Sequence, residues 1–83
     1  MGEGNSWEDR IVLDPAVLAG KPVIRGTRIA VEFLIDLLAE GWSQQRILDN
    51  YLQISREHIL ASLHWASEVL RSEKVYPLPR KSA

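Results

Sequence analysis

Few residues in this chain have both the chemistry and the spacing that catalysis requires. The two histidines, His58 and His64, lie six positions apart in one predicted helix, whereas two metal ligands on one helix face need a spacing of three or four. Ser62 lies too close to His64 along that helix to act as a nucleophile with this base. The chain has no cysteine, which excludes disulfides, thiolate metal sites and cysteine nucleophiles. We therefore expect no catalytic activity, no metal site and no cofactor.

The densest basic group of the chain lies within residues 20–30. Lys21, Arg25 and Arg28 fall in a stretch that holds two glycines and no acid. The tight turn over residues 25–28 offers guanidinium groups, a hydroxyl and backbone N–H groups, which could hold a phosphate. The turn matches no phosphate-loop motif. The favoured interpretation is a structural hinge that ends a β segment and starts the helical part, with its arginines solvated or paired with acids.

Composition narrows the class of protein. The chain has 83 residues, enough for one domain, and a net charge of -1. A dedicated nucleic-acid binder usually carries a basic surplus, because phosphate contacts supply most of its affinity. No apolar run approaches the ~20 residues of a membrane span, and the polar N-terminus lacks a signal-peptide pattern. We expect a cytoplasmic protein that does not enter membranes and that could contact nucleic acid only through local basic patches.

The part of the chain before the helices is expected to hold short strands. Residues 1–10 are polar and are predicted to form a flexible tail. Residues 11–13 are an apolar run typical of a strand, and Asp14 then caps a single helical turn over residues 15–19. Residues 23–29 are predicted to form a short hairpin or bent strand pair around the tight turn.

Three helices are predicted, over residues 31–40, 44–51 and 56–71. Ser43 and Ser55 act as N-caps of the second and third helix, and each follows an apolar residue that pairs with another five positions later, a hydrophobic staple. The third helix is expected to bury one apolar stripe, which consists of Ile59, Leu60, Leu63, Ala66 and Leu70. Its opposite, exposed face is expected to consist of Glu57, Ala61, His64 and Glu68.

The order of these elements predicts the fold. They indicate a mainly α protein, a three-helix homeodomain-like helix-turn-helix bundle preceded by a short β-hairpin or strand segment. No linker or internal repeat is evident. We expect a single domain over residues 11–74, followed by an extended, proline-containing tail over residues 75–83.

DNA contacts would begin at the start of the third helix, because that is where a helix-turn-helix reads base edges. The candidate DNA-binding residues are Ser55, Arg56, His58 and Ser62 on the helix, with Lys21, Arg25 and Arg28 as basic support. Two carboxylates on the exposed face of the same helix would repel phosphates. The topology thus favours DNA and the charges oppose it, so a helix-turn-helix scaffold that serves protein contacts stays open as an alternative.

The string Gly-Lys-Pro-Val-Ile-Arg-Gly-Thr-Arg-Ile at residues 20–29 follows an Asp-Pro pair and precedes a helix and a Gly-Trp-Ser segment. With these features residues 11–70 resemble the small bacterial proteins called domain of unknown function 433. The signature positions present are Gly20, Lys21, Pro22, Gly26, Thr27 and Arg28. Ala30 stands where members often have proline. The resemblance implies an antitoxin-like helix-turn-helix protein, often encoded beside a nuclease toxin of the PIN type, with no catalytic role for the motif.

Two functional hypotheses follow from the resemblance and the capped helices. The first is a cytoplasmic antitoxin-like protein that forms a homodimer, binds a PIN-type toxin and also binds double-stranded operator DNA. The second is a homo-oligomeric protein-interaction module without DNA binding, which the near-neutral charge and the acidic helix face favour. In both, the homodimer is expected to be built on the β segment or on the last helix.

Overall fold

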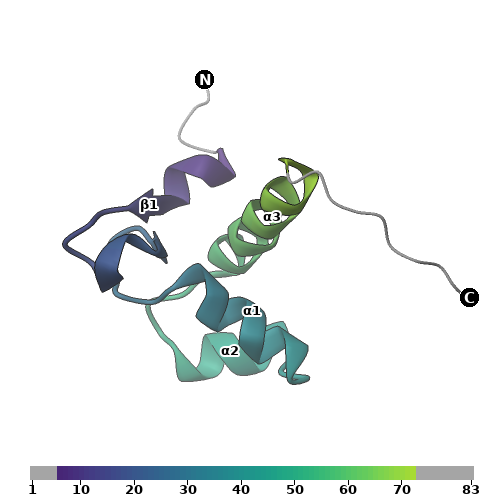
Figure 1. Ribbon diagram of the computed structural model, residues 1–83. Helices are drawn as coiled ribbons and strands as arrows, with labels where there is room; N and C mark the ends of the chain where they lie inside the picture. Colours follow the sequence, from purple (N-terminus) through teal and green to yellow (C-terminus); the bar gives the residue numbers. More distant parts are fainter. Residues whose placement is uncertain (1–5, 73–83) are drawn as a thin grey trace, which may run out of the picture.

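The computed structural model describes residues 6–72 and has three α-helices preceded by a two-stranded antiparallel hairpin (Figure 1). The elements in chain order are the 3-10 helix η1 (Trp7–Arg10), β1 (Ile11–Leu13), the 3-10 helix η2 (Leu18–Gly20), β2 (Pro22–Ile24), α1 (Val31–Ala39), α2 (Gln44–Asn50) and α3 (Arg56–Ser72). The expected fold, mainly α with a short β segment in front, is therefore confirmed. The expected tail over residues 75–83 lies outside the described residues.

The hairpin pairs β1 with β2 across a long loop. Its register places Ile11 opposite Ile24, and Val12 opposite Val23. The strand predicted at residues 11–13 is right, but the hairpin predicted within residues 23–29 is reduced to one bridge, between Val23 and Ala30. The sequence suggested a local hairpin because the tight turn is local, whereas pairing with β1 depends on contacts across the loop.

The loop between the strands turns in a left-handed conformation. The Asp14 carboxylate accepts a hydrogen bond from the Ala16 N–H at 2.9 Å, as the predicted cap requires. The helical turn expected over residues 15–19 does not follow, because Leu18, Ala19 and Gly20 have φ values of 50°, 55° and 85°. Glycine adopts this region freely, while leucine and alanine do so at a cost of about 1 kcal/mol or more.

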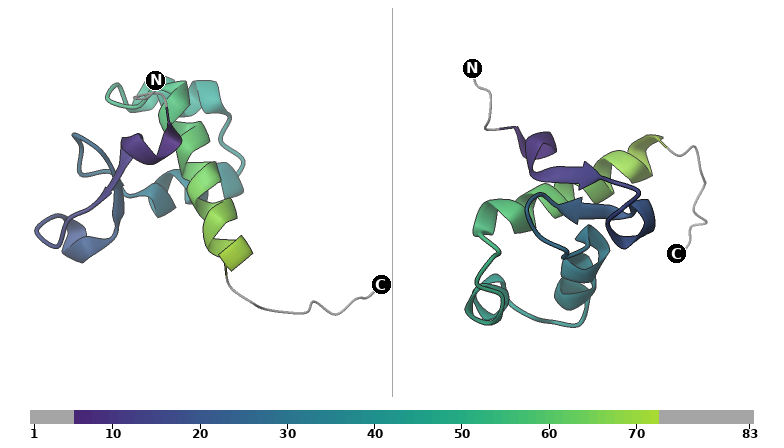
Figure 2. Two further views of the ribbon diagram at one scale, coloured as in Figure 1. Left: turned by 90° about the horizontal axis from the view of Figure 1, so that it is seen from above. Right: turned by 90° about the vertical axis from the view of Figure 1, so that its left-hand side faces the viewer.

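The N-terminal segment is structured from Ser6 onward, so the prediction of a flexible tail is wrong for residues 7–10. The hydroxyl of Ser6 caps η1 by accepting from the N–H of Glu8. η1 then lies along α3 (Figure 2). The Trp7 ring stacks on the His64 ring, with 5.7 Å between the ring centroids. A tryptophan that has a helix to pack against thus orders a segment whose composition is otherwise polar.

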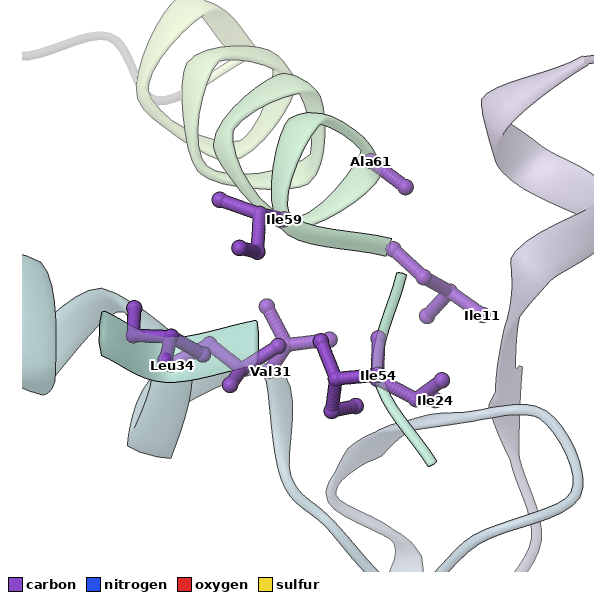
Figure 3. Packing of buried hydrophobic residues seen from close by; sticks show 8 residues of the cluster. Ile11, Ile24, Val31, Leu34, Ile54, Ile59 and Ala61 are labelled. Carbon is purple, nitrogen blue, oxygen red and sulfur yellow. The ribbon is translucent and has the colours of Figure 1, made fainter. Parts of the chain in front are cut away.

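The core lies where the hairpin and the three helices meet. Figure 3 shows aliphatic side chains from both strands and from α1 and α3 converging there. The largest fully buried side chains are those of Ile24, Leu34, Ile47, Ile59, Val23, Val31 and Ser62. Both predicted N-caps are confirmed, since the Ser43 hydroxyl accepts from the Arg46 N–H at 3.0 Å and the Ser55 hydroxyl from the His58 N–H at 3.3 Å. The helix limits agree with the prediction to within one residue.

α3 does not bury the whole apolar stripe that its sequence suggested. Ile59 is buried as predicted, but the three leucines of the stripe are exposed: Leu60 by 39%, Leu63 by 41% and Leu70 by 69%. Ala61 and Ser62 take their place in the interior, at 1% and 0% exposure. Two small side chains allow η1 and the hairpin to approach the helix closely, and this approach decides which face of α3 turns inward.

Candidate interaction surfaces

The Gly-Thr turn of the basic stretch is held together by its own hydrogen bonds. Thr27 donates its backbone N–H to the Ile24 carbonyl at 3.0 Å, and its hydroxyl donates to the same oxygen at 2.8 Å. The hydroxyl also accepts from the Ile29 N–H at 2.9 Å. Gly26 has φ +83° with open space around it, so glycine is needed there for its conformation rather than its size. These N–H groups are satisfied internally, which leaves them unavailable to a phosphate.

Two of the three cations in the stretch hold neighbouring elements. The Arg25 N–H donates to the Arg10 carbonyl at 2.8 Å and its Nε donates to the Asp9 carbonyl at 2.6 Å, so Arg25 binds the C-terminal end of η1. Lys21 forms an ion pair of 2.8 Å with Glu32 on α1. The hydrogen bond and charge of Glu32 raise the pKa of Lys21. The basic stretch is therefore chiefly a clamp that joins η1, the hairpin and α1.

Arg28 is the cation of this stretch that serves no such clamp. Its side chain is exposed, and it makes no hydrogen bond or ion pair with any other residue in the described range 6–72. Within residues 6–72, Arg28 is thus the one of the three basic residues proposed to support DNA binding whose charged group makes no hydrogen bond or ion pair.

The start of α3 uses two of the candidate DNA-binding residues as caps. Ser55 and His58 form a reciprocal capping box, because the Ser55 N–H donates to the His58 Nδ1 at 3.0 Å while the Ser55 hydroxyl accepts from the His58 N–H. Burial lowers the pKa of His58, the charge of Arg10 lowers it further, and Glu57 acts in the opposite direction. The neutral imidazole that accepts this hydrogen bond is thus the favoured form.

Of the other two candidate DNA-binding residues on α3, one is buried and the other is exposed. Ser62 is completely buried and donates its hydroxyl to the His58 carbonyl at 3.0 Å, so it cannot reach a nucleic acid and its prediction as a DNA-binding residue is wrong. Arg56 is exposed and makes no hydrogen bond or ion pair with another described residue. Its neighbour Glu57 is also exposed, which leaves mixed charges at the start of the helix.

The C-terminal half of α3 extends past the other helices (Figures 1 and 2). Two open hollows flank this half of the helix. One, of about 340 Å³, opens toward η1 and is lined by Trp7, Glu8 and Glu68 among others. The second, of about 320 Å³, opens toward α1 and includes Glu32. Both share one apolar wall, formed by Trp65 and Val69. Val69 is 42% exposed, so this half of the helix is only partly covered by the described chain.

Three leucines of α3, Leu60, Leu63 and Leu70, are exposed. Leu70 lines the hollow that opens toward α1, and Leu60 lines a further hollow beside Trp7 and Arg10. The sequence did contain this signal, since α3 has more apolar residues than one face of a small domain can cover. It could not show which of them stay outside.

Within residues 6–72, no group of three or more histidine, aspartate or glutamate side chains is arranged to hold a metal ion. Over the same range, no helix is both long and apolar enough to cross a membrane.

The fold and these surfaces define a small, mainly helical domain with an N-terminal hairpin and exposed apolar surface on its last helix. A family model described as "Protein of unknown function (DUF433)" matches residues 11–66, and the chain belongs to this family. The resemblance drawn from the basic stretch is therefore confirmed.

Two relatives show how far the similarity extends. A crystal structure of a DUF433 member from Anabaena variabilis matches with a TM-score of 0.72 and 28% identity, over 77% of this chain and 63% of that chain. An uncharacterized protein of Sinorhizobium fredii, y4eO, is 34% identical over 65 residues, or 77% of this chain. This chain spans 29% of the length of y4eO, so what the whole of that protein does is a separate question.

Proposed function

We infer that this chain is an antitoxin-like protein-binding module, without catalysis, whose partner binds the C-terminal half of α3. The observation that carries this inference is the pair of hollows on either side of Trp65 and Val69. A partly exposed apolar wall with concave flanks provides the kind of pocket that an apolar anchor of a protein partner fills.

The charge around the hollows favours a basic partner. Glu8 and Glu68 line one hollow and Glu32 the other. Glu68 and Glu32 are in ion pairs with Arg71 and Lys21, but each of these pairs is more than half exposed. Exposed pairs contribute only about 0–1 kcal/mol, so they exchange partners at little cost. A nuclease carries positive charge to bind its nucleic acid, which matches the PIN-type toxin implied by the family resemblance and a cytoplasmic site of action.

The test is co-purification with the product of the neighbouring gene. Val69→Asp places a charge on the shared wall of both hollows and is expected to abolish the complex while the helical circular dichroism stays unchanged. Leu52→Asp is the matched control, because Leu52 is a 90% exposed leucine on the connection between α2 and α3. A complex that survives Val69→Asp, or a neighbouring product that does not bind the wild-type chain, would contradict the inference.

DNA binding is the second candidate function. It is favoured by one observation, that Arg56 and Arg28 are exposed and unengaged within the described chain while α2 and α3 are joined by a short connection. In titrations of the upstream promoter, Arg56→Ala should relax sequence discrimination, and Arg28→Ala should weaken binding to all sequences and flatten its salt dependence. Binding no tighter than to random duplex would eliminate this candidate.

A further inference from the structure

The hollow that opens toward α1 has walls of mostly apolar side chains. Pro22 comes from β2, Ile35 from α1, and Trp65 and Val69 from α3, while Glu32 supplies a charge at the edge. The indole N–H of Trp65 makes no hydrogen bond with another residue of the described range 6–72. Extended, proline-containing peptides bind grooves that are lined by aromatic rings, so this hollow suits such a peptide.

The sequence that follows α3 contains a peptide of this kind. Residues 75–79 read Val-Tyr-Pro-Leu-Pro, and we call them the proline segment. Two prolines at a spacing of two favour an extended, polyproline-like backbone, which loses little conformational entropy on binding. Tyr76 and Leu78 add two large apolar side chains to this backbone. The proline segment therefore has the composition of a ligand for an apolar hollow with an aromatic wall.

The proline segment is close enough along the chain to reach this hollow. α3 ends at Ser72, which lines the opposite hollow together with Trp65 and Val69. From Ser72 back to Trp65 the helix spans about 10 Å, at ~1.5 Å per residue. After a turn at residues 73 and 74, the proline segment covers about 15 Å at ~3.1 Å per residue. Such a short tether also keeps the local concentration in the millimolar range, which favours the same chain over a second copy.

The charges beside the hollow are complementary to those that follow the proline segment. Glu32 lies at the edge of the hollow, and Asp36 lies one helical turn further along the exposed side of α1. Lys21 pairs with Glu32 in an exposed ion pair, whereas Asp36 makes no ion pair with a described residue. Arg80 and Lys81 come directly after the proline segment. A segment that runs from α3 toward α1 brings these cations to the acids, so charge favours this direction.

We propose that the proline segment docks into the hollow toward α1 of its own chain, with Tyr76 and Leu78 against Trp65 and Ile35, and that a protein partner displaces it. The docking requires no partner, whereas the displacement rests on the function proposed above. The side of α3 that faces η1 is covered only when the partner binds. The partner therefore has a first contact on that side before the proline segment leaves.

A nitroxide spin label at Ser82→Cys tests the docking, and the absence of native cysteine makes the label specific. The label is expected to broaden the amide NMR signals of Glu32 and Ile35 in the full-length chain. Leu78→Asp in the labelled chain should remove this broadening. A mixture of the spin-labelled chain with an isotope-labelled chain that carries no nitroxide should show none. Absence of broadening in the single chain, its survival in Leu78→Asp, or broadening in the mixture alone would overturn the proposal.

Affinity for the neighbouring gene product tests the displacement. Leu78→Asp is expected to bind this product severalfold more tightly than the wild-type chain, because a larger fraction of the variant has the hollow open. Leu52→Asp is the matched control and should bind as the wild type does. Equal affinity would contradict the displacement, and weaker affinity would show that the proline segment itself contacts the partner. A product that binds none of these chains would contradict the proposed function alone, since the spin-label result does not depend on it.

Discussion

The two halves of α3 differ in what covers them. Residues 56–62 start with a reciprocal capping box and bury Ile59, Ala61 and Ser62 against the core. Residues 63–72 have no fully buried residue and carry the more exposed leucines together with Val69. One continuous helix therefore serves stability in its first half and offers apolar surface in its second. The difference shows that the helical pattern of apolar residues alone does not separate buried core positions from exposed apolar surface.

The largest change in the free energy of unfolding should come from a substitution in the buried first half of α3. Ile59→Ala removes a completely buried side chain and is expected to lower the free energy of unfolding by about 2–5 kcal/mol. Leu70→Ala removes a mostly exposed side chain and should change it by less than about 0.5 kcal/mol under monomeric conditions. Urea unfolding at low protein concentration measures both. Equal losses would remove the distinction between the two halves.

The cap of the first half should give an intermediate effect. Ser55→Ala removes the hydroxyl that accepts the His58 N–H and is expected to cost about 1 kcal/mol in thermal or urea unfolding. Ser67→Ala, in the exposed half, is the matched control and should be close to neutral. If Ser67→Ala were the more damaging change, the cap would not be what anchors α3.

The smallest expected effect is on the pH dependence of stability. The pKa of His58 lies below its ordinary value because burial and the Arg10 charge disfavour the imidazolium, against the charge of Glu57. The unfolded chain therefore takes up this proton more readily than the folded chain, so stability falls as the pH drops below the ordinary histidine value of ~6.5. His58→Gln keeps a capping side chain and should remove this contribution. An unchanged pH dependence in that variant would show that His58 is not the group responsible.

Local signals predicted the local structure of this chain well. A few neighbouring residues are enough to predict the helix caps at Ser43 and Ser55. The same is true of the turn at Gly26, whose positive φ only glycine adopts without strain. The family signature also proved to be structural at Lys21, which pairs with Glu32 on α1, and at Thr27, which closes the turn.

Long-range packing was not predictable in the same way. No feature of the polar sequence around Trp7 predicts that this segment forms η1 or that Trp7 stacks on His64. The orientation of α3 depends on that contact, because η1 covers the side of the helix that holds Ala61. Adjacent small and large residues leave the inward face of α3 undetermined. The sequence therefore predicts an accessible Ser62 and a buried Leu63, whereas the structure has the reverse.

Amide hydrogen exchange of α3 tests the central claim most directly, in the isolated chain and in the complex with the neighbouring gene product. The account predicts that residues 56–62 are protected in both samples. It predicts that residues 63–72 exchange faster in the isolated chain and gain protection in the complex, since that half is covered only when the partner binds. Equal protection of residues 63–72 in the two samples would contradict the claim that this half of α3 is the partner-binding surface.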